Sequence, residues 1–285
     1  MKFAYYPGCS ATQTSIEYDE SVRETAQNLG LELVEMADWT CCGASSGHTM
    51  NQELALALPC QNIVLANELS LGIITPCPAC SLRHQAAEYR LKRDSTAKAK
   101  IETDIGAAVD LSRRSKHVLE VLYKDVGIEG IRKRVQKPLK GLKVVPYYGC
   151  YLVRPPEVTE FDDADNPVAM DEIMKAIGAE VIDWSSKIDC CGGSASIPVP
   201  EVVRKLSGGI IEAAREVDAG AIVTACPMCH ANLEMFQAKS EDFAPMPILY
   251  FSELTALAFG SVHVKEYVEK HIVDSSSLLA TLNLL

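Results

Sequence analysis

The same cysteine motifs occur twice along this 285-residue chain, and this repeat limits its possible folds more than any other feature. Four blocks return in the same order after about 140 to 150 residues. The matched pairs are YYPGC (5–9) with YYGC (147–150), LGLELVEMADW (29–39) with IGAEVIDW (177–184), CCGASSG (41–47) with CCGGSAS (190–196), and GIITPCPACSLRHQA (72–86) with GAIVTACPMCHANLE (220–234). Ordered matches at one separation indicate a duplicated domain.

Each copy alternates short apolar runs with stretches of helical pattern. In the first copy the expected strands are 3–6, 31–36 and 72–76, and the expected helices are 17–29 and 51–70. In the second copy the expected strands are 143–148, 179–184 and 221–225, and the expected helices are 168–177 and 200–217. This alternation is typical of α/β folds with parallel sheets. Because the cysteine motifs follow the strands, they should converge at one rim of each sheet.

We therefore expect an α/β fold with two domains related by a pseudo-twofold axis, each a small, mainly parallel sheet flanked by helices. The first domain is predicted over 1–90 and the second over 143–285, with a helical tail at the C-terminus. The segment 91–142 matches neither copy and is rich in Lys and Arg. It is predicted to be a helical connector, either simply solvated or presenting a basic docking face to an acidic partner.

Composition limits the function classes. A formal net charge of −11 argues against nucleic-acid binding, and the chain has no apolar run of 18 residues that would predict a membrane span. The start, MKFAYYPGCS, lacks the features of a signal peptide, so we expect a cytoplasmic protein. In that reducing compartment eleven cysteines indicate metal or redox chemistry rather than structural disulfides.

Ten of the eleven cysteines fall into two sets of five. The first set is Cys9, Cys41, Cys42, Cys77 and Cys80, and the second is Cys150, Cys190, Cys191, Cys226 and Cys229. The double cysteine and the CxxC motif are separated by 34 residues in both copies. Cys60 stands alone in an expected helix, and we expect it to pack in the core.

Several kinds of site compete for these sets. A structural zinc ion takes four ligands, one fewer than each set offers, and adjacent side chains diverge too much to chelate one ion well. An iron–sulfur cluster presents several irons to thiolates, so it accommodates adjacent cysteines. We expect iron–sulfur clusters, with zinc in one site and plain redox thiols as alternatives. The segment 226–230 also matches the CxxCH of haem attachment, but the first copy has no histidine there.

Residues outside the cysteines are weaker candidates. Lys187, just before the second double cysteine, could bind an anionic group of a substrate, although a solvated loop lysine is the alternative. His230, like His48 and His84, lies near an expected ligand in the sequence. Each of these histidines could give a proton to a departing thiolate, or could be an ordinary core or surface histidine.

The motifs YYPGC, CCGASSG, PCPAC and CCGG together resemble the cysteine-rich CCG domains, and most closely the B subunit of heterodisulfide reductase. The resemblance covers residues 1 to about 235. It implies that each set of five cysteines holds a noncubane [4Fe-4S] cluster. It also implies that a disulfide such as CoM-S-S-CoB is reduced between the clusters. The electrons would come from a ferredoxin-like partner, which receives them from a flavin-bearing partner of the same complex.

Three hypotheses follow for the function. In the first, the chain is a catalytic subunit that reduces a disulfide or runs the reverse reaction. In the second, it is a CCG-type electron-transfer subunit of a lactate or glycolate oxidising complex, and its clusters only relay electrons. In the third, it is a zinc-stabilised scaffold with no enzymatic role.

Overall fold

Two four-stranded parallel sheets form the centre of the computed structural model, which describes residues 1–44, 47–238 and 245–285. The first sheet has the order β2 (Glu32–Glu35), β1 (Lys2–Tyr5), β3 (Ile73–Thr75) and β4 (Lys116–His117). The second has the order β6 (Glu180–Val181), β5 (Lys143–Tyr147), β7 (Ala221–Thr224) and β8 (Ile248–Tyr250). All six strand pairs are parallel, which confirms the predicted α/β class.

Two helices of the first half, α2 (Ile16–Asn28) and α4 (Gln52–Glu68), lie where the pattern predicts them, and further helices lie beside them. The further helices are α1 (Gly8–Ala11), α3 (Gly47–Met50), α5 (Pro78–Arg93) and α6 (Ser95–Ile105). The start of α4 is fixed by Asn51, whose side chain accepts hydrogen bonds from the first turn. Pro78 occupies the first turn of α5, where its missing N–H leaves no helical hydrogen bond unmade.

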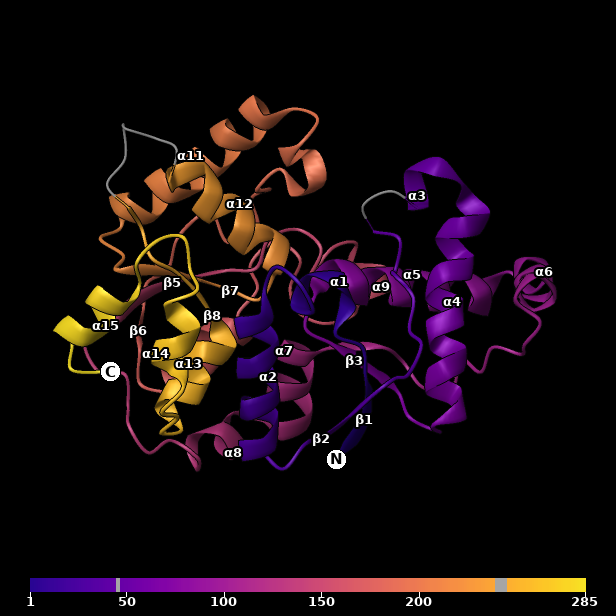
Figure 1. Ribbon diagram of the computed structural model, residues 1–285, viewed down its shortest axis with the longest axis horizontal. Coiled ribbons are helices and arrows are strands. Elements are labelled where there is room, and N and C mark those ends of the chain that lie inside the picture. Colours follow the sequence, from indigo (N-terminus) through magenta and orange to yellow (C-terminus); the bar gives the residue numbers. More distant parts are fainter. Residues whose placement is uncertain (45–46, 239–244) are drawn as a thin grey trace.

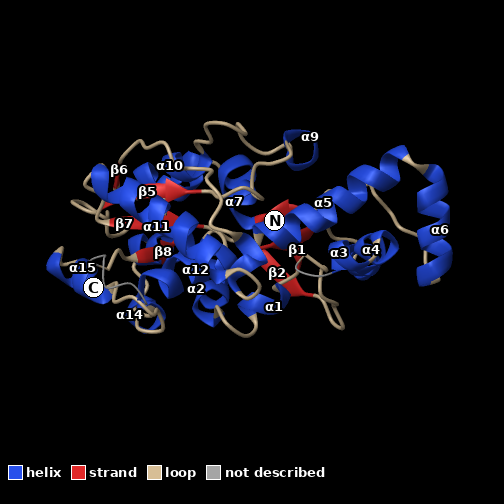
Figure 2. Ribbon diagram, turned by 90° about the horizontal axis from the view of Figure 1, so that it is seen from above, coloured by secondary structure: helices blue, strands red, loops and turns tan. Residues whose placement is uncertain are grey.

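The second half repeats this arrangement and adds helices at its end. Its helices are α9 (Pro156–Thr159), α10 (Ala169–Ala176), the 3₁₀ turn η2 (Gly193–Ser196), α11 (Pro200–Glu216), α12 (Pro227–Ala238), α13 (Phe251–Ala258), α14 (Val264–Val268) and α15 (Ser276–Thr281). Figure 2 shows the two groups of strands, each flanked by helices. In Figure 1, α11 and α12 rise on one side of the molecule and α3 and α4 on the other, with α1 between them.

The segment predicted as a connector differs from a purely helical linker. It contains α7 (Val118–Glu120), the π-helix η1 (Val121–Val126) and α8 (Ile128–Arg132), but also β4, which pairs with β3. The first sheet therefore extends beyond residue 90. The sequence could not reveal β4, because a two-residue strand of Lys116 and His117 contains no apolar run. The division into domains stays a prediction.

The two halves are joined by a buried contact between α2 and α13. The hydroxyls of Ser21 and Ser252 are 2.7 Å apart, and the hydroxyl of Thr25 donates to the carbonyl of Ser252 at 3.1 Å. The ring of Tyr18 stacks on that of Tyr250 with centroids 4.0 Å apart. One hydrophobic cluster contains side chains of both halves, so the core fixes one half against the other.

Candidate metal centres

All five cysteines of the second half line one cavity of about 300 Å³. Cys150 follows β5, Cys190 and Cys191 lie in the loop after β6, and Cys226 and Cys229 flank the start of α12. The Sγ atoms of Cys191 and Cys229 are 3.5 Å apart. Five thiols around one volume exceed the four ligands of tetrahedral zinc and fit a cluster of several irons.

The first half brings its five cysteines together in the same way. The Sγ atoms of Cys42 and Cys80 are 3.3 Å apart. The thiol of Cys41 is hydrogen-bonded to Cys42, and that of Cys77 to Cys80. Cys9 lies close enough to interact electrostatically with Cys41. The predicted convergence of the cysteines at the rim of each sheet is therefore what the structure shows.

Hydrogen bonds between the thiols separate their pKa values. The hydrogen bond from Cys41 lowers the pKa of Cys42 to about 3. In the second half, the hydrogen bond from Cys150 lowers the pKa of Cys190 to about 6, although burial opposes this shift. These hydrogen bonds favour the thiolate at Cys42 and Cys190, and thiolate is the form that binds iron.

Two glycines allow the backbone to approach the last cysteine of each set. Gly8 has φ +75°, and a Cβ atom there would lie 3.1 Å from the Sγ of Cys80. Gly149 has φ +65°, and its Cβ would lie 3.1 Å from the Sγ of Cys229. A larger residue would be strained in this backbone conformation and would also crowd the sulfur.

Peptide groups also face the double cysteines. The N–H of Gly43 lies 3.4 Å from the Sγ of Cys41. In the second half, the N–H of Gly192 lies 3.3 Å from the Sγ of Cys190. Donors of this kind stabilise negative charge on sulfur, and in iron–sulfur proteins they raise the reduction potential.

Two buried tyrosines that the sequence argument missed hold the loops of the double cysteines. The hydroxyl of Tyr6 donates to the carbonyl of Thr40 at 2.8 Å, and that of Tyr147 donates to the carbonyl of Asp189 at 2.7 Å. Thr40 and Asp189 each directly precede a double cysteine. The repeat could have revealed these tyrosines, because each lies three residues before the first cysteine of its copy.

The two CxxC motifs meet at one buried point. The hydroxyl of Tyr18 lies 2.9 Å from the carbonyl oxygen of Pro76 and 2.9 Å from that of Ala225. The Nε2 of His117 lies 2.7 Å from the same oxygen of Pro76. Pro76 and Ala225 directly precede the two CxxC motifs, and Pro78 of the first half lines the cavity of the second. The two candidate metal centres therefore lie on adjoining parts of the two halves.

Lys187 is placed in a buried ion pair rather than at the cavity wall. Its Nζ lies 2.9 Å from a carboxylate oxygen of Asp171, and 5% of its side chain is exposed. Its carbonyl accepts the N–H groups of Tyr148 and Gly149 at 2.8 and 3.1 Å, which positions the loop of Cys150. This geometry gives Lys187 a positioning role, and contact with a substrate stays a prediction.

The histidines are also away from the lining of the cavity described above. His230 is buried on α12 with its Nε2 3.2 Å from the carbonyl of Ile248, and His84 is buried with its Nδ1 2.8 Å from the carbonyl of Cys80. The side chain of His48 lies outside the described residues. Proton transfer by His230 stays a prediction. Cys60 has no exposed surface and packs in the core, as its isolated position predicted.

Comparison with known proteins gives matches over nearly the whole chain. A family model described as CCG, a cysteine-rich domain, matches residues 3–83 and 144–234. The 8-methylmenaquinol:fumarate reductase membrane anchor subunit of Wolinella succinogenes is 32% identical over 97% of this chain and 99% of its own length. The B subunit of the ferredoxin/F(420)H(2)-dependent CoB-CoM heterodisulfide reductase of Methanosarcina acetivorans is 28% identical over 98% of this chain and 96% of its own length.

The fold is shared with a solved structure of another protein. The crystal structure of a hypothetical protein from Helicobacter pylori superposes with a TM-score of 0.74 and 9% identity, covering 97% of this chain. This chain spans 52% of that protein, and the likeness shows the fold alone. Among the described residues, no helix has both the length and the apolar character needed to cross a membrane.

Proposed function

The chain belongs to the CCG cysteine-rich domain family, and from this membership we propose that it reduces a disulfide, or reversibly forms one, between two iron–sulfur clusters. The proposed ligands are Cys9, Cys41, Cys42, Cys77 and Cys80 for the first cluster, and Cys150, Cys190, Cys191, Cys226 and Cys229 for the second. Both clusters are proposed to be noncubane [4Fe-4S], held in the cytoplasm. Relatives that carry the name of the B subunit of heterodisulfide reductase support this assignment.

The observation that carries the proposal is the meeting of the two CxxC motifs at Tyr18. Reducing a disulfide consumes two electrons and two protons and releases two thiols. When bound, each cluster would supply one electron and a site for one product sulfur. Two electron-donating clusters on adjoining halves suit a disulfide with an S–S bond of about 2.05 Å, because each sulfur atom can face one cluster.

The residues of the chain would position this chemistry and exclude water from it. Tyr148, Tyr151 and Met228 line the cavity of the second half, and its surface is mostly apolar. Tyr147 keeps the loop of the double cysteine in place through its hydrogen bond to Asp189. A wall of this kind lowers the local dielectric constant, so that the peptide N–H groups near the thiolates act more strongly on developing charge.

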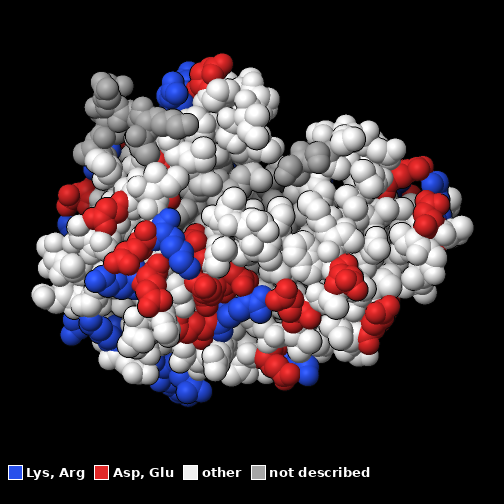
Figure 3. Space-filling view, viewed as in Figure 1, with Lys and Arg blue, Asp and Glu red and all other residues white. Residues whose placement is uncertain are grey.

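Electrons are proposed to come from a ferredoxin-like partner, itself supplied by a flavin-bearing partner of the same complex. Apolar side chains near the second centre remain exposed, among them Ile197 at 90% and Val202 at 48%. In Figure 3 the surface between α11 and α3 is mostly free of charged residues, although charged residues lie at the top of α11. Exposed apolar side chains beside a redox centre suit contact with a partner that delivers electrons there.

A second candidate is an electron-transfer subunit whose clusters relay electrons and bind no disulfide. It is favoured by the relative from Wolinella succinogenes, which is the more identical of the two described above and is named as part of a fumarate reductase. The lactate or glycolate complexes named by the sequence argument would belong to the same class.

Electron paramagnetic resonance of the oxidised protein separates the two functions. Anaerobically purified protein is titrated with coenzyme M, coenzyme B and other small thiols, and with thioether analogues of the same size as controls. A disulfide reductase should give a changed cluster signal with a thiol and an unchanged signal with the thioether. A signal that none of these thiols alters would exclude the first function and leave the relay.

A further inference from the structure

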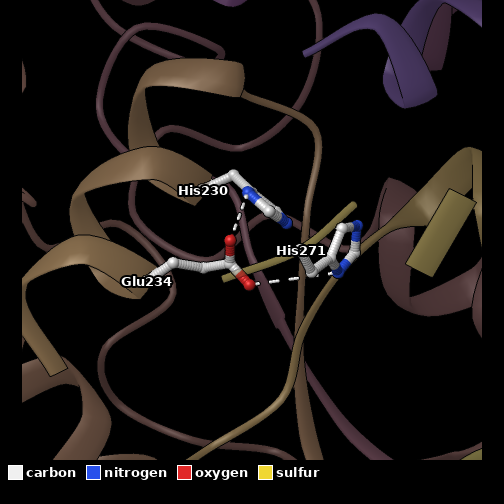
Figure 4. A group of neighbouring side chains, drawn as sticks. All are labelled: His230, Glu234 and His271. Atoms are coloured by element: carbon white, nitrogen blue, oxygen red, sulfur yellow. Dashed lines mark ion pairs between the residues drawn. The ribbon is translucent and has the colours of Figure 1, made fainter. Parts of the chain in front are cut away.

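Three buried side chains from two segments of the second half meet at one point (Figure 4). His230 and Glu234 lie one turn apart on α12, and His271 comes from the segment after α14. The Nδ1 of His230 is 3.6 Å from one carboxylate oxygen of Glu234, and the Nδ1 of His271 is 3.9 Å from the other. One ligand atom from each residue lies within 4.8 Å of the other two.

Both imidazoles turn their Nδ1 toward Glu234. The Nε2 of His271 lies 2.9 Å from a carboxylate oxygen of Glu253, and the Nε2 of His230 lies 3.2 Å from the carbonyl of Ile248. Because these partners only accept hydrogen bonds, each neutral ring carries its proton on Nε2. The Nδ1 lone pairs then face the carboxylate of Glu234, so three electron-pair donors point at one another.

No hydrogen bond within the described part of the chain relieves this arrangement. The Nδ1 of His271 has no hydrogen-bond partner there, although none of its side chain is exposed. The separations of 3.6 and 3.9 Å from Glu234 are longer than an ordinary N–H···O hydrogen bond. A cation bound between these buried electron-pair donors would stabilise them.

We propose that His230, Glu234 and His271 bind one zinc ion, at a site separate from the ten cysteines. Two imidazole nitrogens and one carboxylate are an established set of protein ligands for Zn²⁺. The outer contacts also fit, since a histidine that binds metal usually donates its other N–H to a carboxylate or a carbonyl. Binding would draw the donors from at most 4.8 Å to about 3.3 Å apart, the spacing in tetrahedral zinc.

A zinc ion at this site would link the segment after α14 to α12, the helix that carries the second CxxC motif. Glu234 already accepts the N–H groups of Ile272 and Val273 at 3.0 and 3.3 Å, so its carboxylate is fixed from the other side. The first half has no equivalent, because the repeat places Ser81 and Gln85 where the second half has His230 and Glu234. One such zinc per chain is therefore expected.

Metal analysis and zinc K-edge absorption of the anaerobically purified full chain test the proposal. The expected result is about one zinc per chain with only nitrogen and oxygen ligands near 2.0 Å. A sulfur shell near about 2.3 Å would place the zinc on cysteines instead and would overturn the proposal. So would the absence of zinc after dialysis against Zn²⁺ and removal of the excess. These outcomes do not depend on the disulfide chemistry proposed above.

Variants give a second, independent readout. Glu234→Gln keeps the volume of the side chain and removes its charge, and it should lower the zinc content at least tenfold while the iron content stays at the level of the parent protein. His271→Ala should have the same effect on zinc. The matched control is His263→Ala, because His263 is largely exposed on the same terminal region. Full zinc occupancy in Glu234→Gln would refute the site.

Discussion

The hydroxyl of Tyr18 lies 2.9 Å from the carbonyl oxygen of Ala225, a residue 207 positions away in the other half of the repeat. Ala225 directly precedes Cys226, and the same hydroxyl is equally close to the carbonyl that precedes the first CxxC motif by one residue. The hydroxyl has one proton for two buried acceptors, and His117 supplies a further donor. Both CxxC motifs are thereby held by shared donors from the first half.

Removing this hydroxyl should destabilise the whole molecule. Tyr18→Phe keeps the ring stacked on Tyr250 but removes a donor from two buried carbonyls, which costs about 1–3 kcal/mol. Anaerobic chemical unfolding should show this loss in the free energy of unfolding. Tyr89→Phe is the control, because Tyr89 lies near the surface of α5, and it should change the stability little. Equal stability of the two variants would show that the shared hydrogen bond contributes nothing.

Gly149→Ala should empty the second metal centre and spare the first. The new methyl group would lie 3.1 Å from the Sγ of Cys229 at a φ of +65°. We expect about half of the iron to be lost, since one of two equal clusters is affected. Gly106→Ala is the matched control, with φ +71° but no heavy atom within 4 Å of its Cβ. If both variants kept all their iron, the close approach to Cys229 would have no role in metal binding.

Lys187→Met should lower the free energy of unfolding by about 3 kcal/mol, because it leaves Asp171 buried without its cation. Although burial lowers the pKa of Lys187, its hydrogen bond and ion pair with Asp171 outweigh this and raise the pKa. The stabilisation is therefore complete below the unfolded pKa of about 10.4 and is lost as pH rises through the higher folded value.

Unfolding of the parent protein and of Lys187→Met, followed from pH 8 to above about pH 10.5, measures this difference. The stabilities of the two proteins should approach each other only at the alkaline end. Lys175→Met is the control, because Lys175 forms an ion pair at the surface. A constant difference over the whole range would mean that the charge of Lys187 is not what stabilises the loop.

Cys60 should behave as a core residue. Burial raises the pKa of its thiol to about 12, and none of the residue is exposed. Iodoacetamide at about pH 8 should therefore leave Cys60 unmodified in the folded protein and modify it once denaturant is added, as mass spectrometry of peptides can show. Cys60→Ala should retain all the iron, whereas Cys42→Ala should not. Rapid labelling of Cys60 in the folded protein would contradict its placement.

The repeat made much of the architecture predictable. Short apolar runs before each cysteine motif located β1, β3, β5 and β7, because a buried parallel strand needs an apolar side chain at nearly every position. The convergence of the cysteines followed from that, since parallel strands end at the same edge. The strand β4 could not be found in this way, because Lys116 and His117 carry no apolar signal.

The contacts between the two halves could not be predicted from the sequence either. The pairing of Tyr18 with Ala225 and of Ser21 with Ser252 joins residues more than 200 positions apart. Nothing in the local pattern of α2 says which of its polar side chains will be buried. Lys187 shows the same limit, because a lysine in a loop is usually solvated and only the folded chain brings Asp171 to it.

The central claim is that two clusters lie on adjoining halves of the chain, and anaerobic crystallography with anomalous diffraction at the iron edge tests it most directly. The account predicts two separate iron peaks of four irons each, one within each set of five cysteines, on either side of Tyr18 and Ala225. Iron in one set alone, zinc in place of iron among the cysteines, or disulfide bonds within either set would contradict it.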